Sequence, residues 1–284
     1  MYDAVPLEPS PRETPQGTLR GTPLKTPRKP LVRSAVSTLS LVWLNLFFWL
    51  SVPLVTLAFL IGGVFYTGLF FLIVRNRRRT KWLVRRTISR YGATTLRCGW
   101  PLVRVSYVDR APQDKPPFIF VSNHRSASDA YIMACLPFEC IQVLNNWPSR
   151  IPIFGSIAKI AGYLTVRKMP FDEFVEAGSK LLADGVSIIA FPEGTRSGSR
   201  QMGMFHGSAL RLAQQAGANI APLAISGNEN IPKRGSMLLH PGRIVITKLP
   251  AITRQDYKDL SAYKLKTLVR EQIQRELDIQ AAGA

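Results

Sequence analysis

The chain is poor in the residues that most often build metal sites and disulfide frameworks. It has three cysteines and three histidines in 284 residues, and no two cysteines form a C-x-x-C pair. An odd number of isolated cysteines indicates neither a disulfide framework nor a zinc site, and three scattered histidines do not indicate a multi-histidine site. We therefore expect a protein of a reducing compartment that holds no metal.

Acidic residues are also scarce. Lys and Arg outnumber Asp and Glu by 37 to 18, which gives a formal net charge of +19. A positive field of this size attracts nucleic acid, anionic lipid head groups or an acidic protein. The basic residues cluster beside an uncharged run and no nucleic-acid recognition motif is present, so we expect membrane lipids and not nucleic acid as partners.

Charge is absent altogether from residues 34 to 74. One straight helix of about 40 residues would measure about 60 Å, twice the roughly 30 Å hydrocarbon core, so we predict a break at Pro53 or at Gly62-Gly63. Basic residues flank both ends, and the positive-inside rule places both flanks on the cytoplasmic face. This requires two spans or a re-entrant hairpin; the alternative is a buried helix pair in a soluble protein.

The composition divides the chain into four parts. Residues 1–33, rich in Pro, Thr and Arg, are expected to form a disordered basic tail, and residues 34–79 a membrane-embedded helical hairpin. Residues 80–252 are expected to form an α/β domain that begins with a basic amphipathic helix, which lies on anionic lipid or is simply solvated. Residues 253–284 are expected to form a C-terminal helix.

Short apolar runs alternate with helical patterns from Val103 onward, which is typical of an α/β fold with a mostly parallel central sheet flanked by helices. The predicted strands are Val103–Val108, Phe118–Val121, Ile141–Leu144, Tyr163–Val166, Ser187–Phe191, Ile220–Ile225 and Arg243–Thr247.

A histidine and a carboxylate follow the second of these strands. His124 and Asp129 are five residues apart, about 140° on one helix, so His124 is expected in a turn and Asp129 in the helix after it. Ser126-x-x-Asp129 is also a capping-box spacing, so one interpretation is a helix cap beside a polar loop residue. In the other, Asp129 orients His124, whose second ring nitrogen takes a proton from a hydroxyl.

A second polar cluster, Phe191-Pro192-Glu193-Gly194-Thr195-Arg196-Ser197, follows the fifth predicted strand and would by itself indicate only a turn. Together with Asn123-His124-x-Ser126-x-x-Asp129 it resembles the NHxSxxD and FPEGTRS blocks of the glycerophospholipid acyltransferases. Gly162–Arg167 and Ala221–Ser226 are similar to two further blocks of that family. The resemblance covers roughly residues 100 to 250.

The resemblance implies transfer of a fatty acyl group from acyl-CoA or acyl carrier protein to the free hydroxyl of a lysophospholipid, most simply 1-acylglycerol 3-phosphate. It implies His124 as general base with Asp129 as its partner, and no cofactor besides the acyl donor. It assigns acceptor binding to five residues, which are Arg167, Glu193, Gly194, Thr195 and Arg196.

The two arginines are suited to a phosphomonoester because each is a planar bidentate donor that follows a strand. Glu193 repels phosphate and would instead anchor an arginine or a glycerol hydroxyl. The chain departs from many relatives in having His206 between Phe205 and Gly207, and we expect His206 to be a solvated residue at a helix start. His240, before Pro241 and Gly242, is expected in a turn.

Two other functions fit part of this pattern. An acyltransferase for another lysolipid, such as lyso-ornithine lipid, would use the same base. A non-catalytic membrane-surface protein would use the positive charge alone. A serine hydrolase is disfavoured because no G-x-S-x-G elbow is present.

Overall fold

The computed structural model describes residues 38–144, 152–165, 169–197, 201–229, 231–233 and 235–282. The chain divides into two units, Met1–Ser37 and Thr38–Ala284. The tail predicted at residues 1–33 lies outside the described residues, and the helices and strands that the structure describes belong to the second unit.

Seven strands form one sheet in the order β1-β7-β6-β2-β5-β3-β4. Every neighbouring pair is parallel except β6 and β7. This confirms the predicted α/β fold with a mostly parallel sheet, and each predicted strand is present. Their bounds are β1 Val103–Asp109, β2 Phe118–Ser122, β3 Cys140–Leu144, β4 Leu164–Thr165, β5 Ser187–Ala190, β6 Asn219–Ser226 and β7 Gly242–Lys248.

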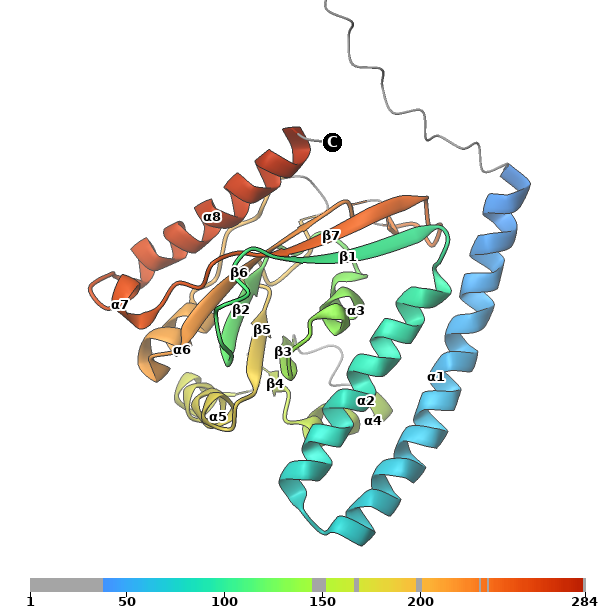
Figure 1. Ribbon diagram of the computed structural model, residues 1–284, viewed down its shortest axis with the longest axis horizontal. Helices are drawn as coiled ribbons and strands as arrows, with labels where there is room; N and C mark the ends of the chain where they lie inside the picture. Colours follow the sequence, from blue (N-terminus) through green and yellow to red (C-terminus); the bar gives the residue numbers. More distant parts are fainter. Residues whose placement is uncertain are drawn as a thin grey trace, which may run out of the picture. The chain divides into compact units, whose positions relative to one another are not determined.

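Helices cover both faces of the sheet (Figure 1). One face carries α5 (Phe171–Ala183), α6 (Ser208–Ala216) and α8 (Ala262–Ala282), which follows the single turn α7 (Arg254–Tyr257). The other carries α2 (Arg77–Cys98), α3 (Asp129–Ile132), the 3-10 turn Met133–Cys135 and α4 (Pro152–Ala161). Strand β2 lies in the middle and all five of its residues are buried, as both-face coverage requires.

The uncharged run forms one continuous helix, α1 (Thr38–Val74), with Pro53 inside it. The break predicted at Pro53 or Gly62-Gly63 is therefore wrong. A proline inside a helix costs about 3 kcal/mol, and packing of α1 along α2 offsets this cost. The chain turns instead at Arg75, which has a φ of 51°, and Asn76, whose side chain caps α2 by accepting the backbone N–H of Arg79 at 3.1 Å.

The N-terminal hairpin is thus built from α1 and α2, and α2 is the basic helix predicted to begin the next domain. Helix α1 is long and apolar enough to cross a membrane, and most of its large apolar side chains are exposed. Its buried polar residue, Asn45, donates to the Leu239 carbonyl at 3.0 Å and accepts the Leu239 N–H at 2.7 Å. Trp49 donates to the Met237 carbonyl at 2.8 Å. These bonds fasten α1 to the segment between β6 and β7.

Candidate active site

The turn after β2 is held in place by Asn123. Its side-chain amide donates to the Ile225 carbonyl at 2.9 Å, and its side-chain oxygen accepts the Ile225 N–H at 2.8 Å. The side chain therefore continues the pairing between β2 and β6 for one more residue. Because of this, His124 leaves the sheet from a fixed position at the carboxyl end of β2, where ligands gather in open parallel sheets.

His124 and Asp129 form the pair that their spacing suggested. His124 Nδ1 lies 2.7 Å from Asp129 Oδ2, and the carboxylate is fully buried. The same oxygen accepts the backbone N–H groups of Arg125 at 2.8 Å and Ser126 at 3.0 Å, so it is an acceptor and Nδ1 is the donor. The other ring nitrogen, Nε2, is then the one that can take a proton. The imidazole is 22% exposed, which leaves it accessible to a ligand.

Asn228 completes the surroundings of Asp129, and sequence reasoning missed it. Its side-chain amide is fully buried and donates to Asp129 Oδ1 at 2.5 Å. The next residue, Glu229, forms an ion pair with Arg125. The signal was faint, since Asn228 comes two residues after Ser226, the last residue of the fourth family-like block.

Ser126 lies close to the start of α3, as its capping-box spacing predicted. Helix α3 begins at Asp129 with Ser128 as its N-cap residue, and the Ser126 hydroxyl donates to the Ile231 carbonyl at 2.9 Å. Half of the capping box is present, because Asp129 accepts the Ser126 N–H. The other half differs from the box, because the hydroxyl accepts the Ser128 N–H at 3.3 Å instead of the Asp129 N–H.

Glu193, in the turn after β5, connects that turn to the turn after β2. Its Oε1 accepts the His124 N–H at 2.8 Å, its Oε2 accepts the Gly203 N–H at 2.8 Å, and the residue is buried. The Ser197 N–H in turn donates to the His124 carbonyl at 2.9 Å. The Phe191 ring centroid lies 4.6 Å from that of His124. The turn after β5 therefore fixes the backbone and ring of His124 from the side.

The other predicted acceptor-binding residues divide into two groups. Gly194, Thr195 and Arg196 are exposed at the carboxyl end of β5, which pairs with β2, so they lie at the same edge as His124. Gly194 has a φ of 67°, which favours glycine, and a Cβ there would lie 3.2 Å from His206 Cδ2. Arg167 lies outside the described residues, so its predicted partnership with Arg196 stays a prediction.

The remaining histidines are exposed. His206 precedes α6 as predicted, and His240 precedes β7.

Helix α3, which carries Asp129, packs against α2 through Tyr131 and Tyr91, whose ring centroids are 6.1 Å apart. Burial and the neighbouring Tyr91 raise the pKa of Tyr131 to about 12, so this phenol stays neutral at physiological pH. The helix that carries Asp129 thus packs directly against the hairpin.

Comparison with known proteins shows which proteins the chain resembles. Residues 102–226 match the family model described as Acyltransferase. A 1-acyl-sn-glycerol-3-phosphate acyltransferase of Chlamydomonas reinhardtii is 30% identical over 155 residues, which are 51% of this chain and 46% of the relative. The enzyme of the same name from Pseudomonas aeruginosa is 29% identical over 140 residues, 48% of this chain and 54% of the relative. The chain spans about half the length of the curated relatives it matches.

A solved structure shares the fold. The crystal structure of the 1-acyl-sn-glycerophosphate acyltransferase of Thermotoga maritima superposes with a TM-score of 0.68 at 20% identity and covers 86% of this chain and 97% of that one. The resemblance that the four sequence blocks predicted is confirmed over residues 102–226, where the chain matches the Acyltransferase model and is similar to 1-acyl-sn-glycerol-3-phosphate acyltransferases.

Proposed function

We propose that the protein is an O-acyltransferase that moves a fatty acyl group from acyl-CoA or acyl carrier protein to the free hydroxyl of 1-acylglycerol 3-phosphate, giving phosphatidic acid. The observation that carries the proposal is the bond of 2.7 Å between His124 and a fully buried Asp129. The names of the relatives support the choice of acceptor.

The geometry supports direct transfer in two steps. The acceptor oxygen attacks the thioester carbonyl carbon while its proton moves to His124 Nε2. The tetrahedral intermediate then collapses, the C–S bond breaks, and the departing thiolate takes the proton from the imidazolium. A positioned base contributes on the order of 10² to 10⁴ in rate. Asp129 stabilises the transient imidazolium, as a buried carboxylate does in hydrolytic triads.

Acceptor binding is assigned to the edge formed by the carboxyl ends of β2 and β5. Arg196 and Gly194 are exposed there beside His124. We assign the phosphomonoester to Arg196 together with Arg167, because guanidinium groups bind phosphate in a bidentate manner. Glu193 acts as a positioning residue in this proposal, since both of its oxygens accept backbone N–H groups.

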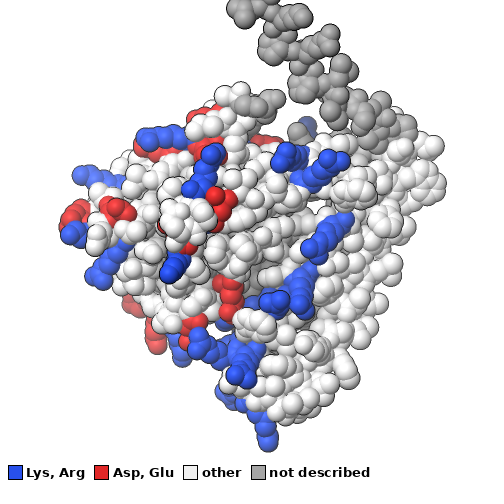
Figure 2. Space-filling view, in the orientation of Figure 1, with Lys and Arg blue, Asp and Glu red and all other residues white. Residues whose placement is uncertain are grey.

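Helix α1 is proposed to hold the enzyme in one leaflet. Figure 2 shows basic side chains over α2 beside the uncharged surface of α1. Asn45 is bound to Leu239, and further along α1 the Thr56 hydroxyl lies 2.9 Å from that of Tyr91 on α2. A helix fastened along its length to a charged domain cannot cross the bilayer without carrying that domain inside. We therefore favour a hairpin that enters the cytoplasmic leaflet and leaves the active site on that face.

The test is an acyl-transfer assay with the purified full chain in detergent. Labelled acyl-CoA and acyl carrier protein are each offered with 1-acylglycerol 3-phosphate, lyso-ornithine lipid and lysophosphatidylcholine. The proposal predicts labelled phosphatidic acid as the main product. It also predicts that Arg196→Ala lowers transfer to the phosphomonoester at least tenfold more than transfer to the other acceptors. Preferred use of lyso-ornithine lipid would reject the acceptor, and no transfer at all would support a non-catalytic protein.

A further inference from the structure

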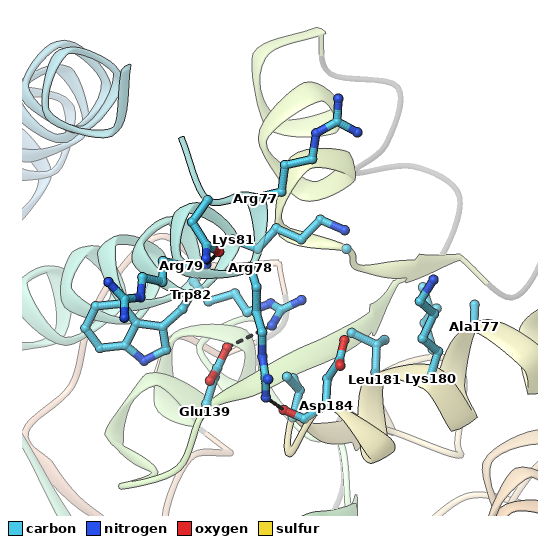
Figure 3. Close-up of a pocket in the computed structure, with 15 residues that line it drawn as sticks. Arg77, Arg78, Arg79, Lys81, Trp82, Glu139, Ala177, Lys180, Leu181 and Asp184 are labelled. Carbon is cyan, nitrogen blue, oxygen red and sulfur yellow. Dashed lines mark hydrogen bonds and ion pairs between the residues drawn. The ribbon is translucent and has the colours of Figure 1, made fainter. Parts of the chain in front are cut away.

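A cleft lies at the opposite end of the strands from His124. It has a volume of about 760 Å³ and lies between the first turns of α2, the start of β4, the end of α5 and the residues before β5 (Figure 3). Because β2 and β5 are parallel and His124 follows the carboxyl end of β2, the residues before β5 mark the other end. The volume lies within the usual range for small-molecule sites.

The cleft carries more positive charge than its own acids neutralise. Its cations are Arg77, Arg78, Arg79, Lys81, Arg85 and Lys180, against the two carboxylates of Glu139 and Asp184. Arg85 is buried and forms an ion pair with Glu139 at 2.8 Å. Arg78 donates to the backbone carbonyl of Asp184 at 2.9 Å. Within the part of the chain that the structure describes, Arg77, Arg79, Lys81 and Lys180 have no ion-pair partner.

The first turn of α2 also has an excess of positive charge, at a place where a helix favours negative charge. Helix N-termini favour acids, because the helix dipole is positive there. Here the first turn contains Arg77, Arg78 and Arg79 and no acid, which destabilises the helix on its own. A bound anion would reverse this effect, since helix N-termini and guanidinium groups both bind phosphate. The arrangement is therefore unfavourable without an anion and favourable with one.

The apolar surroundings identify the source of the phosphate. Helix α1 ends at Val74, and Leu72 and Ile73 near that end are each 72% exposed, a few residues from Arg77. Trp82 lines the cleft and is 41% exposed. The Arg86 guanidinium lies over its ring, with Cζ 5.2 Å from the ring centroid. Tryptophan beside basic residues at the end of an apolar helix is typical of the level of lipid head groups.

We propose that this cleft binds the phosphodiester head group of an anionic membrane glycerophospholipid, at a site separate from the acceptor site at His124. A lipid bound there places its acyl chains beside the exposed end of α1. The head group bridges the first turn of α2 and Lys180 of α5, and so fixes the angle at which the domain meets the leaflet.

The experiment measures flotation of the full chain with two kinds of vesicle, phosphatidylcholine alone and phosphatidylcholine with phosphatidylglycerol. The test variant combines Arg77→Gln, Arg79→Gln and Lys180→Gln. The control removes the same charge from exposed lysines outside the cleft, by Lys115→Gln, Lys258→Gln and Lys264→Gln. We expect the test variant to lose the preference for phosphatidylglycerol by roughly 100-fold and the control to keep it.

Retained binding to phosphatidylcholine shows that the test variant is folded and that α1 still enters the bilayer. A second variant, Arg77→Lys with Arg79→Lys, keeps the charge but lacks the bidentate fork, and we expect it to lose most of the preference as well. Wild-type behaviour of either cleft variant would overturn the proposal, and an equal loss in the lysine control would indicate a diffuse field instead. Displacement of the protein from phosphatidylglycerol by millimolar inorganic phosphate at constant ionic strength would also overturn it, because that result would identify a free anion as the ligand. Acyl transfer in detergent is measured in parallel, so that failure of the catalytic proposal is seen separately.

Discussion

Replacing Asn228 with alanine should slow acyl transfer without changing the residues that touch the substrate. In the described part of the chain, Asn228 is the donor to Asp129 Oδ1, whereas the other three donors bind Oδ2. The variant leaves one oxygen of a fully buried carboxylate without a donor. A hydrogen bond to a charged group contributes about 1.5 to 3 kcal/mol, and if that loss falls on the transition state, kcat drops roughly 10- to 150-fold. This range only reaches the lower end of the loss of about 10² to 10⁴ expected for His124→Ala.

The assay is steady-state acyl transfer with the acyl donor and 1-acylglycerol 3-phosphate varied in turn. A positioning role predicts a fall in kcat with KM nearly unchanged, because Asn228 acts through Asp129 and not through the substrate. Asn219→Ala is the matched control, since it removes the same amide from the amino end of β6, at the other end of that strand. A kcat for Asn228→Ala within twofold of wild type, in a folded protein, would refute this role.

Three further substitutions test the supporting contacts. Glu193→Gln should lower kcat about 10- to 100-fold and lower the melting temperature, because the amide can accept only one of the two backbone N–H groups; kinetics and thermal melts check this. Asn45→Leu should leave detergent activity intact but speed proteolysis between β6 and β7, since both bonds to that segment are lost. Asp109→Asn should destabilise the fold by about 1.5–3 kcal/mol at neutral pH, because the fully buried Lys248 loses the nearer of its two carboxylate partners and keeps only Asp114 at 3.6 Å. Burial raises the pKa of Asp109, but its hydrogen bonds to Lys248 and the Ala111 N–H outweigh burial and leave it below the ordinary value. The wild type should therefore lose this stability as pH falls below about 4, whereas the variant should not, as chemical denaturation at each pH would show.

The sheet was predictable because its signal is local. Each strand is a short apolar run, and the observed bounds differ from the predicted ones by a residue or two. The pairing of His124 with Asp129 was also partly local, since five residues through a turn bring the two side chains together. Both features therefore leave a recognisable signal in neighbouring residues.

The features that sequence reasoning missed depend on contacts distant in sequence. Pro53 is a helix breaker by local rules, but α1 continues through it because α2 packs alongside. Asn228 reaches Asp129 across 99 residues, and no local pattern marks it. The Glu193 carboxylate was visible in the sequence, whereas its partners, two backbone N–H groups, carry no sequence signature.

The central claim is that His124 removes the proton from the acceptor hydroxyl. The most direct test compares the transfer rates of His124→Ala and His240→Ala, which remove the same side chain from the site and from an exposed position before β7. Both proteins are assayed with saturating acyl donor and 1-acylglycerol 3-phosphate after circular dichroism has shown the wild-type fold. We predict a loss of about 10² to 10⁴ for His124→Ala and a wild-type rate for His240→Ala. A His124→Ala enzyme that transfers acyl groups at the wild-type rate would contradict the claim.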